Sequence, residues 1–256
     1  MKTALVCIAK DEDNYIDEWI KYHTKLGFDF VYVYQNCWRY KGDKTQFNNV
    51  HWIEFDGDAK QLEAYHNFLK HQSYQYDWAA FFDVDEYLCL KKHPDVKTFL
   101  AEYADYCAVG VNWRMFGNSG QARVYNENYS LLKRFIMAEY VQNQHIKTIL
   151  NTAKTKDMVL EFCDPHSINE SLHNDFTINT KKSGYIHGPF NTLFDETVQL
   201  NHYYSKTLDE YLLNKKVRGR CDLLSEQRNG QYDIQKFSEL NKNDIEDLTA
   251  RDFYFN

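Results

Sequence analysis

The sequence lacks several features that would mark a linker-rich, membrane-spanning or nucleic-acid-binding protein. It contains only 3 prolines in 256 residues, which argues against long linkers and disorder. No apolar run approaches the roughly 20 residues that a membrane-spanning helix needs. The 30 Lys and Arg residues are outnumbered by 37 Asp and Glu, and a net charge of −7 argues against a protein that binds nucleic acid through a basic face.

Paired cysteines, an export signal and a glycine-rich phosphate loop are also missing. The 6 cysteines are scattered without a C-x-x-C pair, so we expect reduced thiols. Residues 1–9 carry one basic residue and a very short apolar stretch, which predicts a first strand and not a secretion signal, and hence a cytoplasmic protein. No glycine-rich fingerprint follows that strand, which argues against a Rossmann dinucleotide site or a P-loop.

The first third of the sequence alternates regularly between strand and helix patterns. The expected strands are 4–9, 28–34, 51–56 and 78–82, with helices after residue 13 and over 59–76. This order predicts an α/β fold with a mostly parallel central sheet flanked by helices. The second half is less regular, and without a repeat or a clear boundary we expect one domain, 1–256.

The most informative segment joins a strand to three carboxylates. Residues 78–82 are uncharged and mostly bulky, which predicts a buried strand, and Asp83, Asp85 and Glu86 follow directly. In open α/β folds ligands bind at this end of a strand. Crowded carboxylates repel each other unless a cation joins them, and Mg²⁺ or Mn²⁺ bridging them to a diphosphate would meet that need. The alternative is a strand that ends in an acidic, solvated turn.

Further segments follow one another in a familiar order. They are Lys10 to Glu12, Glu18-Trp19, Tyr32 to Asn36, Gln61 with Ala64-Tyr65, Trp78 to Tyr87, Val111 to Trp113 with Phe116-Gly117, Lys147, His166, Asn201 to Lys206, and Arg218-Gly219. Together they resemble the glycosyltransferase family 92-like group (DUF23-type or family-2-like transferases of the GT-A fold) over roughly residues 3–220. The blocks 83–86 and 201–206 are the more specific parts of this resemblance.

The resemblance implies an inverting, metal-dependent enzyme that moves a sugar from a nucleotide donor. Because characterised relatives include galactosyltransferases, UDP-galactose is the leading donor. A single GT-A-type domain would bind it at the carboxyl edge of the strands, with 1–90 as the nucleotide-binding half, 91–220 as the acceptor and catalytic half, and 221–256 as a polar tail.

The resemblance also implies the site residues. Those expected to contact the nucleotide sugar are Ala9, Lys10, Glu12, Asn36, Asp56, Gln61, Asp83, Val84, Asn112, Trp113, Lys147, His166 and Lys206. Those expected to hold Mn²⁺ or Mg²⁺ are Asp83, Asp85 and His202. His202 would otherwise be a packed core histidine. Lys206, Arg218 and Arg220 could balance the charge of the diphosphate, or form a solvated basic helix.

The catalytic base is predicted from position alone. An inverting transfer needs a carboxylate that takes the proton of the acceptor hydroxyl while its oxygen attacks the anomeric carbon. The candidates are Glu127 and Asp164, which lie after the strand that ends at Asp83 and Asp85 (the D-x-D motif). Either would otherwise be a helix cap or a surface acid. A zinc site at Cys163, His166 and His173 is disfavoured because a fourth ligand is missing.

Two other functions compete with glycosyl transfer: a non-catalytic nucleotide- or sugar-binding domain, and a metal-dependent phosphohydrolase. Intact Asp83, Asp85 and His202 argue against the first, and the lack of further Asp and His clusters at strand ends argues against the second. The expected acceptor is a glycan or lipid-linked glycan of bacterial surface polysaccharide or lipopolysaccharide synthesis. The residues that could attach the protein peripherally to the inner face of a membrane are Lys215, Lys216, Arg218 and Arg220.

Overall fold

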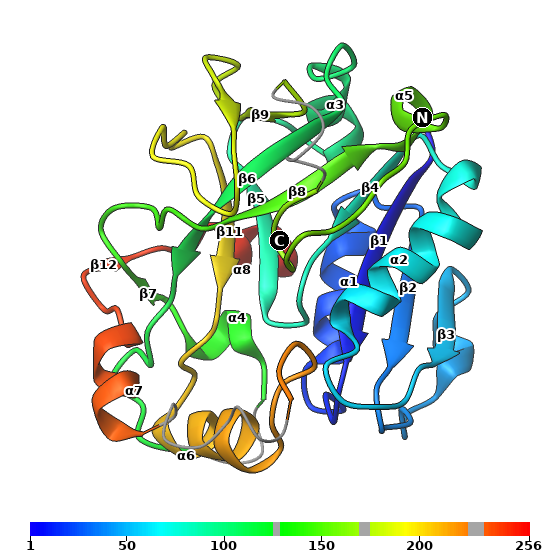
Figure 1. Cartoon of the computed structure of the whole chain (residues 1–256). Helices are drawn as coiled ribbons and strands as arrows, with labels where there is room; N and C mark the ends of the chain where they lie inside the picture. The colour runs from blue at the N-terminus through cyan, green and yellow to red at the C-terminus, as the bar shows by residue number, and fades with distance from the viewer. Residues whose placement is uncertain (125–128, 169–174, 225–232) are drawn as a thin grey trace.

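The first third of the chain forms a parallel sheet with one helix on each face (Figure 1). The computed structural model describes residues 1–124, 129–168, 175–224 and 233–256. Strand β1 pairs in parallel with β2 and β4, and β2 pairs in parallel with β3. These elements are β1 (Thr3–Ala9), α1 (Ile16–Lys25), β2 (Phe30–Gln35), β3 (Val50–Glu54), α2 (Gln61–His71) and β4 (Trp78–Phe81). The predicted α/β fold is confirmed in this part.

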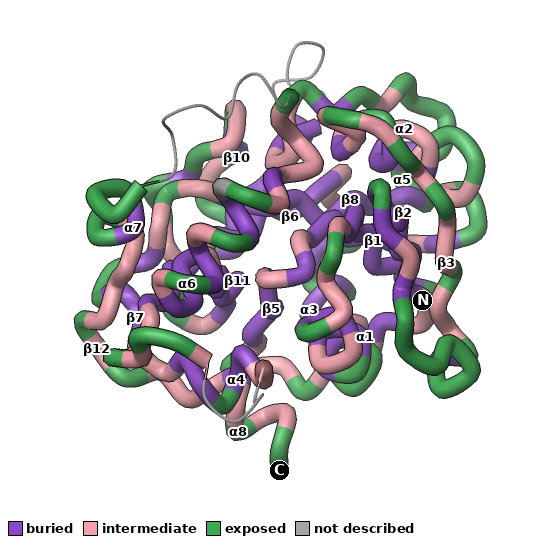
Figure 2. Tube along the Cα trace, turned by 90° about the horizontal axis from the view of Figure 1, so that it is seen from below, coloured by how far each residue is buried: buried purple, intermediate pink, exposed green. Residues whose placement is uncertain are grey.

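Alternate side chains of β1 enter two different hydrophobic cores. Leu5 and Cys7 pack in one cluster with Trp19 of α1, whereas Val6 packs in the other with Tyr65 of α2. All seven residues of β1 are buried, as expected for a parallel strand covered on both faces. Figure 2 shows that buried residues of β1, β5, β6, β8 and β11 lie toward the centre of the molecule.

Beyond β4 the sheet becomes mixed. Strand β8 lies antiparallel between β4 and β6, and β9 and β10 extend the sheet past β6. Strand β11 lies parallel to β6 and antiparallel to β5. These elements are β5 (Glu86–Leu90), β6 (Ala108–Met115), β8 (Ile146–Asn151), β9 (Thr177–Asn179), β10 (Tyr185–Ile186) and β11 (Val198–His202). Because β11 pairs with both β5 and β6, the end of β11 lies beside the start of β5 and the end of β6.

Short elements near the end of the chain pack against the domain. Strand β12 pairs with β7, and Phe253 of α8 packs edge-on against Tyr22 of α1 at 5.2 Å between ring centres. The remaining elements are α3 (Val96–Ala101), α4 (Leu131–Arg134), β7 (Met137–Ala138), α5 (Thr152–Thr155), α6 (Leu208–Tyr211), a π-helical segment (Leu212–Val217), α7 (Ile234–Leu240), β12 (Ile245–Glu246) and α8 (Thr249–Phe255). The described part of the expected polar tail is therefore folded onto the domain.

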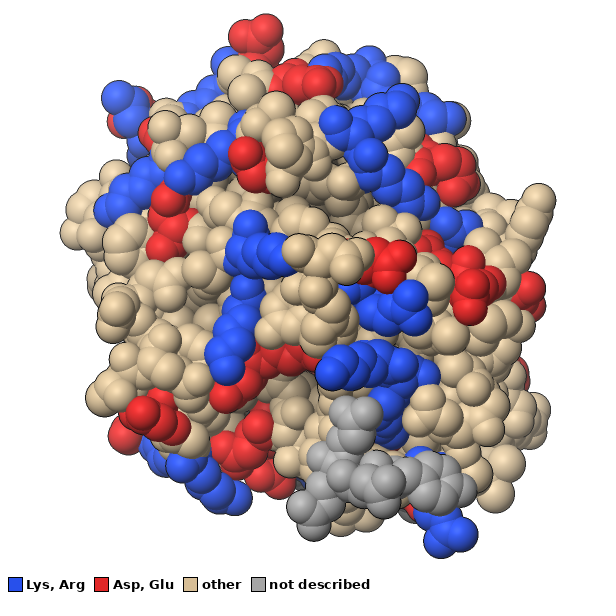
Figure 3. Space-filling model, turned by 180° about the vertical axis from the view of Figure 1, so that it is seen from behind, with Lys and Arg blue, Asp and Glu red and all other residues tan. Residues whose placement is uncertain are grey.

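Two surface properties bear on possible partners. None of the helices in the described ranges combines the length and the apolar character needed to cross a membrane. On the face shown in Figure 3, acidic and basic side chains both occur, so that face is not uniformly basic.

Candidate active site

The acidic turn after β4 lies where three strand ends meet. Asp83 begins a tight turn in which its backbone N–H donates to Glu86 Oε2 at 2.8 Å, and Glu86 N–H donates to the Asp83 carbonyl at 3.0 Å. Strand β11 places His202 opposite Glu86 on β5 and beside Met115 on β6. The backbone N–H of Tyr203 donates to the Asp85 carbonyl at 2.9 Å. The predicted carboxylates and the predicted histidine are therefore brought together.

These strand ends surround a cavity of about 360 Å³. Five groups of residues line it: the end of β1 and its following turn, the start of α2, the acidic turn, the ends of β6 and β11 with two nearby loops, and the C-terminal segment. They are Ile8, Lys10, Glu12, Gln61, Asp83, Val84, Asp85, Trp113, Met115, Asn143, His145, Pro165, His166, His202, Tyr204, Lys215, Arg218, Arg220, Cys221, Asp222, Lys236 and Leu240.

Asp83 is held by a polar network beneath the cavity. Its Oδ1 accepts from Gln61 Nε2 at 2.7 Å and its Oδ2 accepts from Lys147 Nζ at 3.0 Å. The Lys147 ammonium group is fully buried and also lies 3.7 Å from Glu86 Oε2. Burial would lower the pKa of Lys147, yet the carboxylates of Asp83 and Glu86 hold it above its usual value. Lys147 therefore stays charged and neutralises this end of the turn.

Glu86 differs from its two acidic neighbours. Its side chain is completely buried, and that burial raises its pKa well above the usual value despite the attraction of Lys147. Its Oε1 has no hydrogen-bond partner among the residues that the structure describes. Because the Glu86 side chain is buried beneath the turn and accepts a hydrogen bond from the Asp83 backbone, we infer that it stabilises the conformation of the turn.

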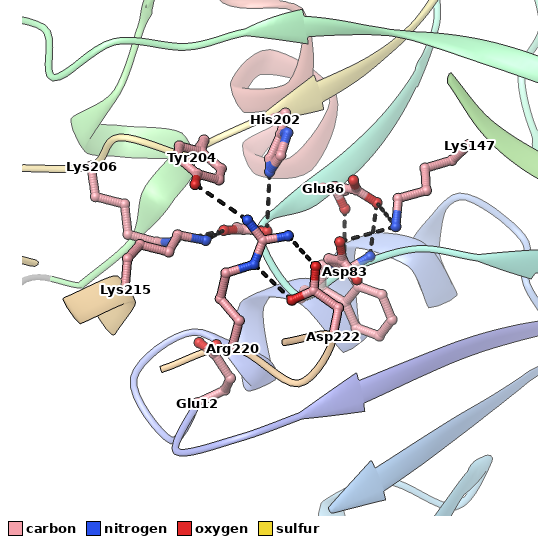
Figure 4. Close-up of polar contacts among 12 residues, drawn as sticks. Glu12, Asp83, Glu86, Lys147, His202, Tyr204, Lys206, Lys215, Arg220 and Asp222 are labelled. Carbon is pink, nitrogen blue, oxygen red and sulfur yellow. Dashed lines mark hydrogen bonds and ion pairs between the residues drawn. The ribbon is translucent and has the colours of Figure 1, made fainter. Parts of the chain in front are cut away.

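Asp85 pairs with the cationic side chains of Lys206 and Lys215, both of which are labelled in Figure 4. Its Oδ2 accepts from Lys206 Nζ at 3.1 Å and from Lys215 Nζ at 3.4 Å. Loss of hydration would raise the pKa of Asp85, but the two ammonium groups hold it well below its usual value. Lys206 adopts a left-handed backbone φ of 51°, a conformation that non-glycine residues rarely adopt outside functional or tightly constrained sites.

His202 faces the remaining oxygen of Asp85. Its Nε2 lies 3.5 Å from Asp85 Oδ1, and its ring packs against Trp113 at 4.2 Å and Tyr204 at 5.3 Å between ring centres. Burial lowers the pKa of His202 below its usual value, so the imidazole is neutral at pH 7. Within the described ranges of the chain, its Nδ1 has no hydrogen-bond partner. His202 is thus buried and also presents one nitrogen to the acidic turn.

The donor atoms fit a divalent ion in part. Asp85 Oδ1 and His202 Nε2 are an oxygen and a neutral imidazole nitrogen that no lysine occupies, and both are ligand types accepted by Mn²⁺. Both oxygens of Asp83 are taken by Gln61 and Lys147. Across the described residues, no group of three or more His, Cys, Asp or Glu is arranged to hold a metal. The geometry therefore favours Asp85 and His202 as ligands over Asp83.

The segment 218–222 closes the cavity over the end of β1. Arg218 donates to Glu12 Oε1 at 2.5 Å, and Gln61 N–H donates to the Cys221 carbonyl at 3.1 Å. Arg220 pairs with Asp222, and its guanidinium group lies between Asp222 and Tyr204 in Figure 4. These basic residues form the cavity wall and not a solvated helix.

Several predicted contacts lie outside the cavity lining. Asn36 uses its amide to donate to the carbonyls of Phe55 and Gly57, and Asp56 pairs with Arg39. The Asn112 amide likewise donates to backbone carbonyls, at 2.9 Å for both Asn143 and Asn191. Ala9 is a buried strand residue, and Lys147 and Lys206 reach the cavity only through their carboxylate partners. The predicted residues that do line it are Lys10, Glu12, Gln61, Asp83, Val84, Asp85, Trp113, His166 and His202.

Of the two predicted bases, Asp164 is placed by the structure, and it is not among the residues that line the cavity. Asp164 accepts from the backbone N–H groups of His166 and Ser167 at 2.7 Å and 3.0 Å and from the Ser167 hydroxyl, so it caps its own loop. Glu127 lies outside the described residues. The predicted attachment to a membrane rested on basic residues at the surface. Three of them, Lys215, Arg218 and Arg220, instead line the cavity.

The lining residues that received no ligand-binding role from the sequence include His145, Tyr204, Lys215 and Asp222. Lys215 and Arg218 are three residues apart, so a helical turn brings both to one face, and that spacing is the signal that would have identified Lys215. His145, Tyr204 and Asp222 lie in irregular segments or at strand ends, where no periodicity distinguishes them.

Comparisons with known proteins give one family and several distant structural likenesses. The model of glycosyltransferase family 92 matches residues 38–188. The crystal structure of S. aureus TarS 1-349 is similar, with 18% identity over 89% of this chain and 68% of that one and a TM-score of 0.45. A 4-diphosphocytidyl-2C-methyl-D-erythritol synthase from Anaerococcus prevotii DSM 20548 has 11% identity over 70% of this chain and 86% of that one, with a TM-score of 0.35. No curated protein matches the sequence.

Proposed function

Because this chain belongs to glycosyltransferase family 92, we propose that it transfers a sugar from a UDP-sugar to a glycan acceptor in the cavity beside Asp85. UDP-galactose is the leading donor, and a glycan or lipid-linked glycan of a bacterial surface polysaccharide is the leading acceptor; both rest on the family resemblance. We further propose that the transfer inverts the anomeric configuration through one in-line displacement.

The observation that carries this proposal is the convergence of cationic side chains on one wall of the cavity. Lys215, Arg218 and Arg220 line it, and Lys206 reaches the same carboxylate as Lys215. Departure of a nucleoside diphosphate leaves negative charge on the phosphate oxygens, and positioned cations lower the barrier by stabilising that charge. A phosphate group entering here would compete with Asp85 for the two lysines.

Asp85 and His202 would hold the divalent ion, Mn²⁺ or Mg²⁺. When bound, such an ion would neutralise charge on the departing diphosphate. The residues of the chain itself do the positioning. Lys147 keeps Asp83 anchored under the turn, and Trp113 provides a flat apolar wall next to His202 of the kind that sugar rings pack against.

A donor screen tests the function. The melting temperature of the protein would be measured with a panel of nucleotide sugars, with and without Mn²⁺, followed by assays of UDP release. We expect UDP-sugars to stabilise the protein and to release UDP, and no stabilisation by any member of the panel would overturn the proposal. For a donor with an α-linked sugar, the anomeric coupling in the NMR spectrum of the product should report a β-linkage; a retained α-linkage would contradict inversion.

A further inference from the structure

An inverting transfer needs a proton acceptor, and the cavity-lining carboxylates within the described ranges are all paired with cations. Glu12 pairs with Arg218, and Asp222 pairs with Arg220. Asp83 and Asp85 each accept from buried lysines, as described above. A carboxylate held in an ion pair is a weaker base because proton uptake would break the pair. The proton acceptor is better sought among the neutral groups of the lining.

His166 is such a group, and its tautomer is fixed by the fold. Its Nδ1 lies 2.9 Å from the Ile146 carbonyl oxygen of β8, and because a carbonyl only accepts, Nδ1 carries the hydrogen. In the neutral ring the lone pair is then on Nε2. Within the part of the chain that the structure describes, no hydrogen bond engages Nε2, and the residue lines the cavity.

The backbone around His166 is also held on both sides. Its N–H donates to Asp164 Oδ1 at 2.7 Å, and its carbonyl accepts from Thr148 Oγ1 at 2.7 Å. With the ring bond to Ile146, these contacts tie one residue to its own loop and to two positions of β8. Such a fixed placement is what a group that must meet a reacting hydroxyl requires.

The electrostatic surroundings keep this imidazole neutral. Burial and the charge of Lys147 together lower the pKa of His166 to about 4, although the hydrogen bond to Ile146 and the charges of Asp83 and Asp164 oppose that shift. At pH 7 the ring is therefore unprotonated, and its basicity is close to that of an ordinary carboxylate. Carboxylates of that basicity serve as catalytic bases in other enzymes.

We propose that His166 is the proton acceptor of the transfer, with Nε2 taking the proton of the acceptor hydroxyl. This inference rests on the proposed function. As the acceptor oxygen forms its bond to the anomeric carbon, its proton passes to Nε2, and the bond between that carbon and the diphosphate oxygen breaks with its electron pair leaving on UDP. The imidazolium ring formed keeps its Nδ1 hydrogen bond to Ile146. Asp164 is then a positioning residue for this ring.

His145 provides a matched control in the same wall. Its ring stacks on Trp113 at 5.0 Å, and its Nδ1 lies 2.8 Å from Asn143 Oδ1, which also accepts the His145 backbone N–H. It too presents Nε2, but the ring is packed between Trp113 and Phe190, at 5.0 and 4.7 Å. We infer that His145 shapes the cavity wall and does not accept the proton.

The test uses His166→Asn and His145→Asn with water and azide as nucleophiles. In His166→Asn the amide nitrogen keeps a donor near the position of Nδ1 but removes Nε2. UDP-galactose, or whichever UDP-sugar stabilises the protein, would be the donor, with UDP release and glycosyl azide formation measured. Azide has no proton to lose, so its attack needs no base.

We expect His166→Asn to lower UDP release to water by about 10²–10⁴-fold and to keep the azide-dependent rate, with donor affinity unchanged. His145→Asn, which changes the cavity wall but removes no base, should affect the water and azide reactions to the same extent. An equal loss of both in His166→Asn, or normal turnover with water, would overturn the assignment. Failure of the wild-type protein to release UDP from every donor would instead count against the proposed function.

Discussion

The ammonium group of Lys206 lies 3.1 Å from Asp85 Oδ2, although the two residues are 121 positions apart in the chain. Lys215 reaches the same oxygen at 3.4 Å. The charge of the D-x-D motif is therefore balanced in part by the protein itself. Binding of a nucleotide sugar with its metal ion would have to break these ion pairs. The two lysines would then pair with the phosphate groups in place of Asp85.

The first prediction concerns Asp85. Asp85→Asn should remove most of the extra stabilisation that UDP gains from Mn²⁺, because the amide is a poorer ligand for the ion. In the wild-type protein a ligand at a hundredfold excess over its Kd adds about 2.7 kcal/mol to the free energy of unfolding. Melting temperatures with UDP, in Mn²⁺ and in a chelator, measure both cases. Equal stabilisation of the wild-type protein in the two buffers would contradict a metal bridge.

The second prediction concerns His202. His202→Ala should abolish the Mn²⁺-dependent gain and the transfer, with little change in the melting temperature of the ligand-free protein. The ligand-free cost is small because the ring already borders a cavity and its Nδ1 bonds to none of the described residues. A large drop in the ligand-free melting temperature would indicate a core histidine, since truncating a packed side chain costs about 2–5 kcal/mol.

The third prediction separates the cavity lysines from surface lysines. Lys215→Met keeps the apolar stem but removes the ammonium group, and should weaken UDP binding by about tenfold or more, since hydrogen bonds to charged groups contribute about 1.5–3 kcal/mol. Lys182→Met is the control, because Lys182 pairs with the half-exposed Glu102 away from the cavity. Calorimetric titration with UDP measures both, and equal affinities would remove Lys215 from the diphosphate site.

The fourth prediction concerns acid stability. Burial would raise the pKa of Glu210, but its bonds to Arg134, Thr207 and Tyr15 hold it at about 2. A carboxylate with a depressed folded-state pKa contributes stability above its unfolded value near 4.5, and that contribution, about 3 kcal/mol here, is lost as the pH falls toward 2.

Glu210→Gln should therefore cost several kcal/mol at pH 7, and the difference from the wild-type protein should shrink below pH 4.5. Glu102→Gln is the control: its pKa is also about 2, but the side chain is 49% exposed, so solvent screens its ion pairs. Urea unfolding at several pH values measures this. A gap between wild type and Glu210→Gln that does not change with pH would refute the assignment.

The fifth prediction tests the packing of the C-terminal segment. A Cβ at Gly117 would lie 2.2 Å from the Lys242 carbonyl, so Gly117→Ala must displace the chain between α7 and β12. We expect a loss of about 1–3 kcal/mol. At Gly184 the nearest atoms would be 3.5 Å and 3.6 Å away, so Gly184→Ala should be close to neutral. Equal melting temperatures of the two variants would show that this segment is not packed as described.

The sequence predicts those features that depend on local pattern. The parallel strands β1, β2, β3 and β4 follow from apolar runs separated by helical spacing, and the place of Asp83 and Asp85 at the cavity follows from carboxylates at a strand end. The pairing of His202 with Asp85 followed from the family resemblance, because nothing in the local sequence links residues so far apart.

Other features depend on long-range geometry that pattern does not contain. A buried apolar strand such as β8 gives no sign of its direction, so its antiparallel insertion between β4 and β6 was not foreseen. Asn36 and Asp56 have suitable side chains at strand ends, but neighbouring backbone groups and Arg39 already use them. Residue type alone does not show which polar groups are already satisfied within the fold.

The pairing of β5 with β11 affects the order in which the chain folds during synthesis. In the described part of the structure, β5 joins the sheet only through β11, which lies more than 100 residues later. A nascent chain emerging from the ribosome therefore presents the strands of its first sheet well before β5 has a partner. The acidic turn lacks its contacts with His202 and Tyr203 until β11 and the residue after it have been synthesised. The candidate site is thus completed late in translation, after the sheet on which it rests.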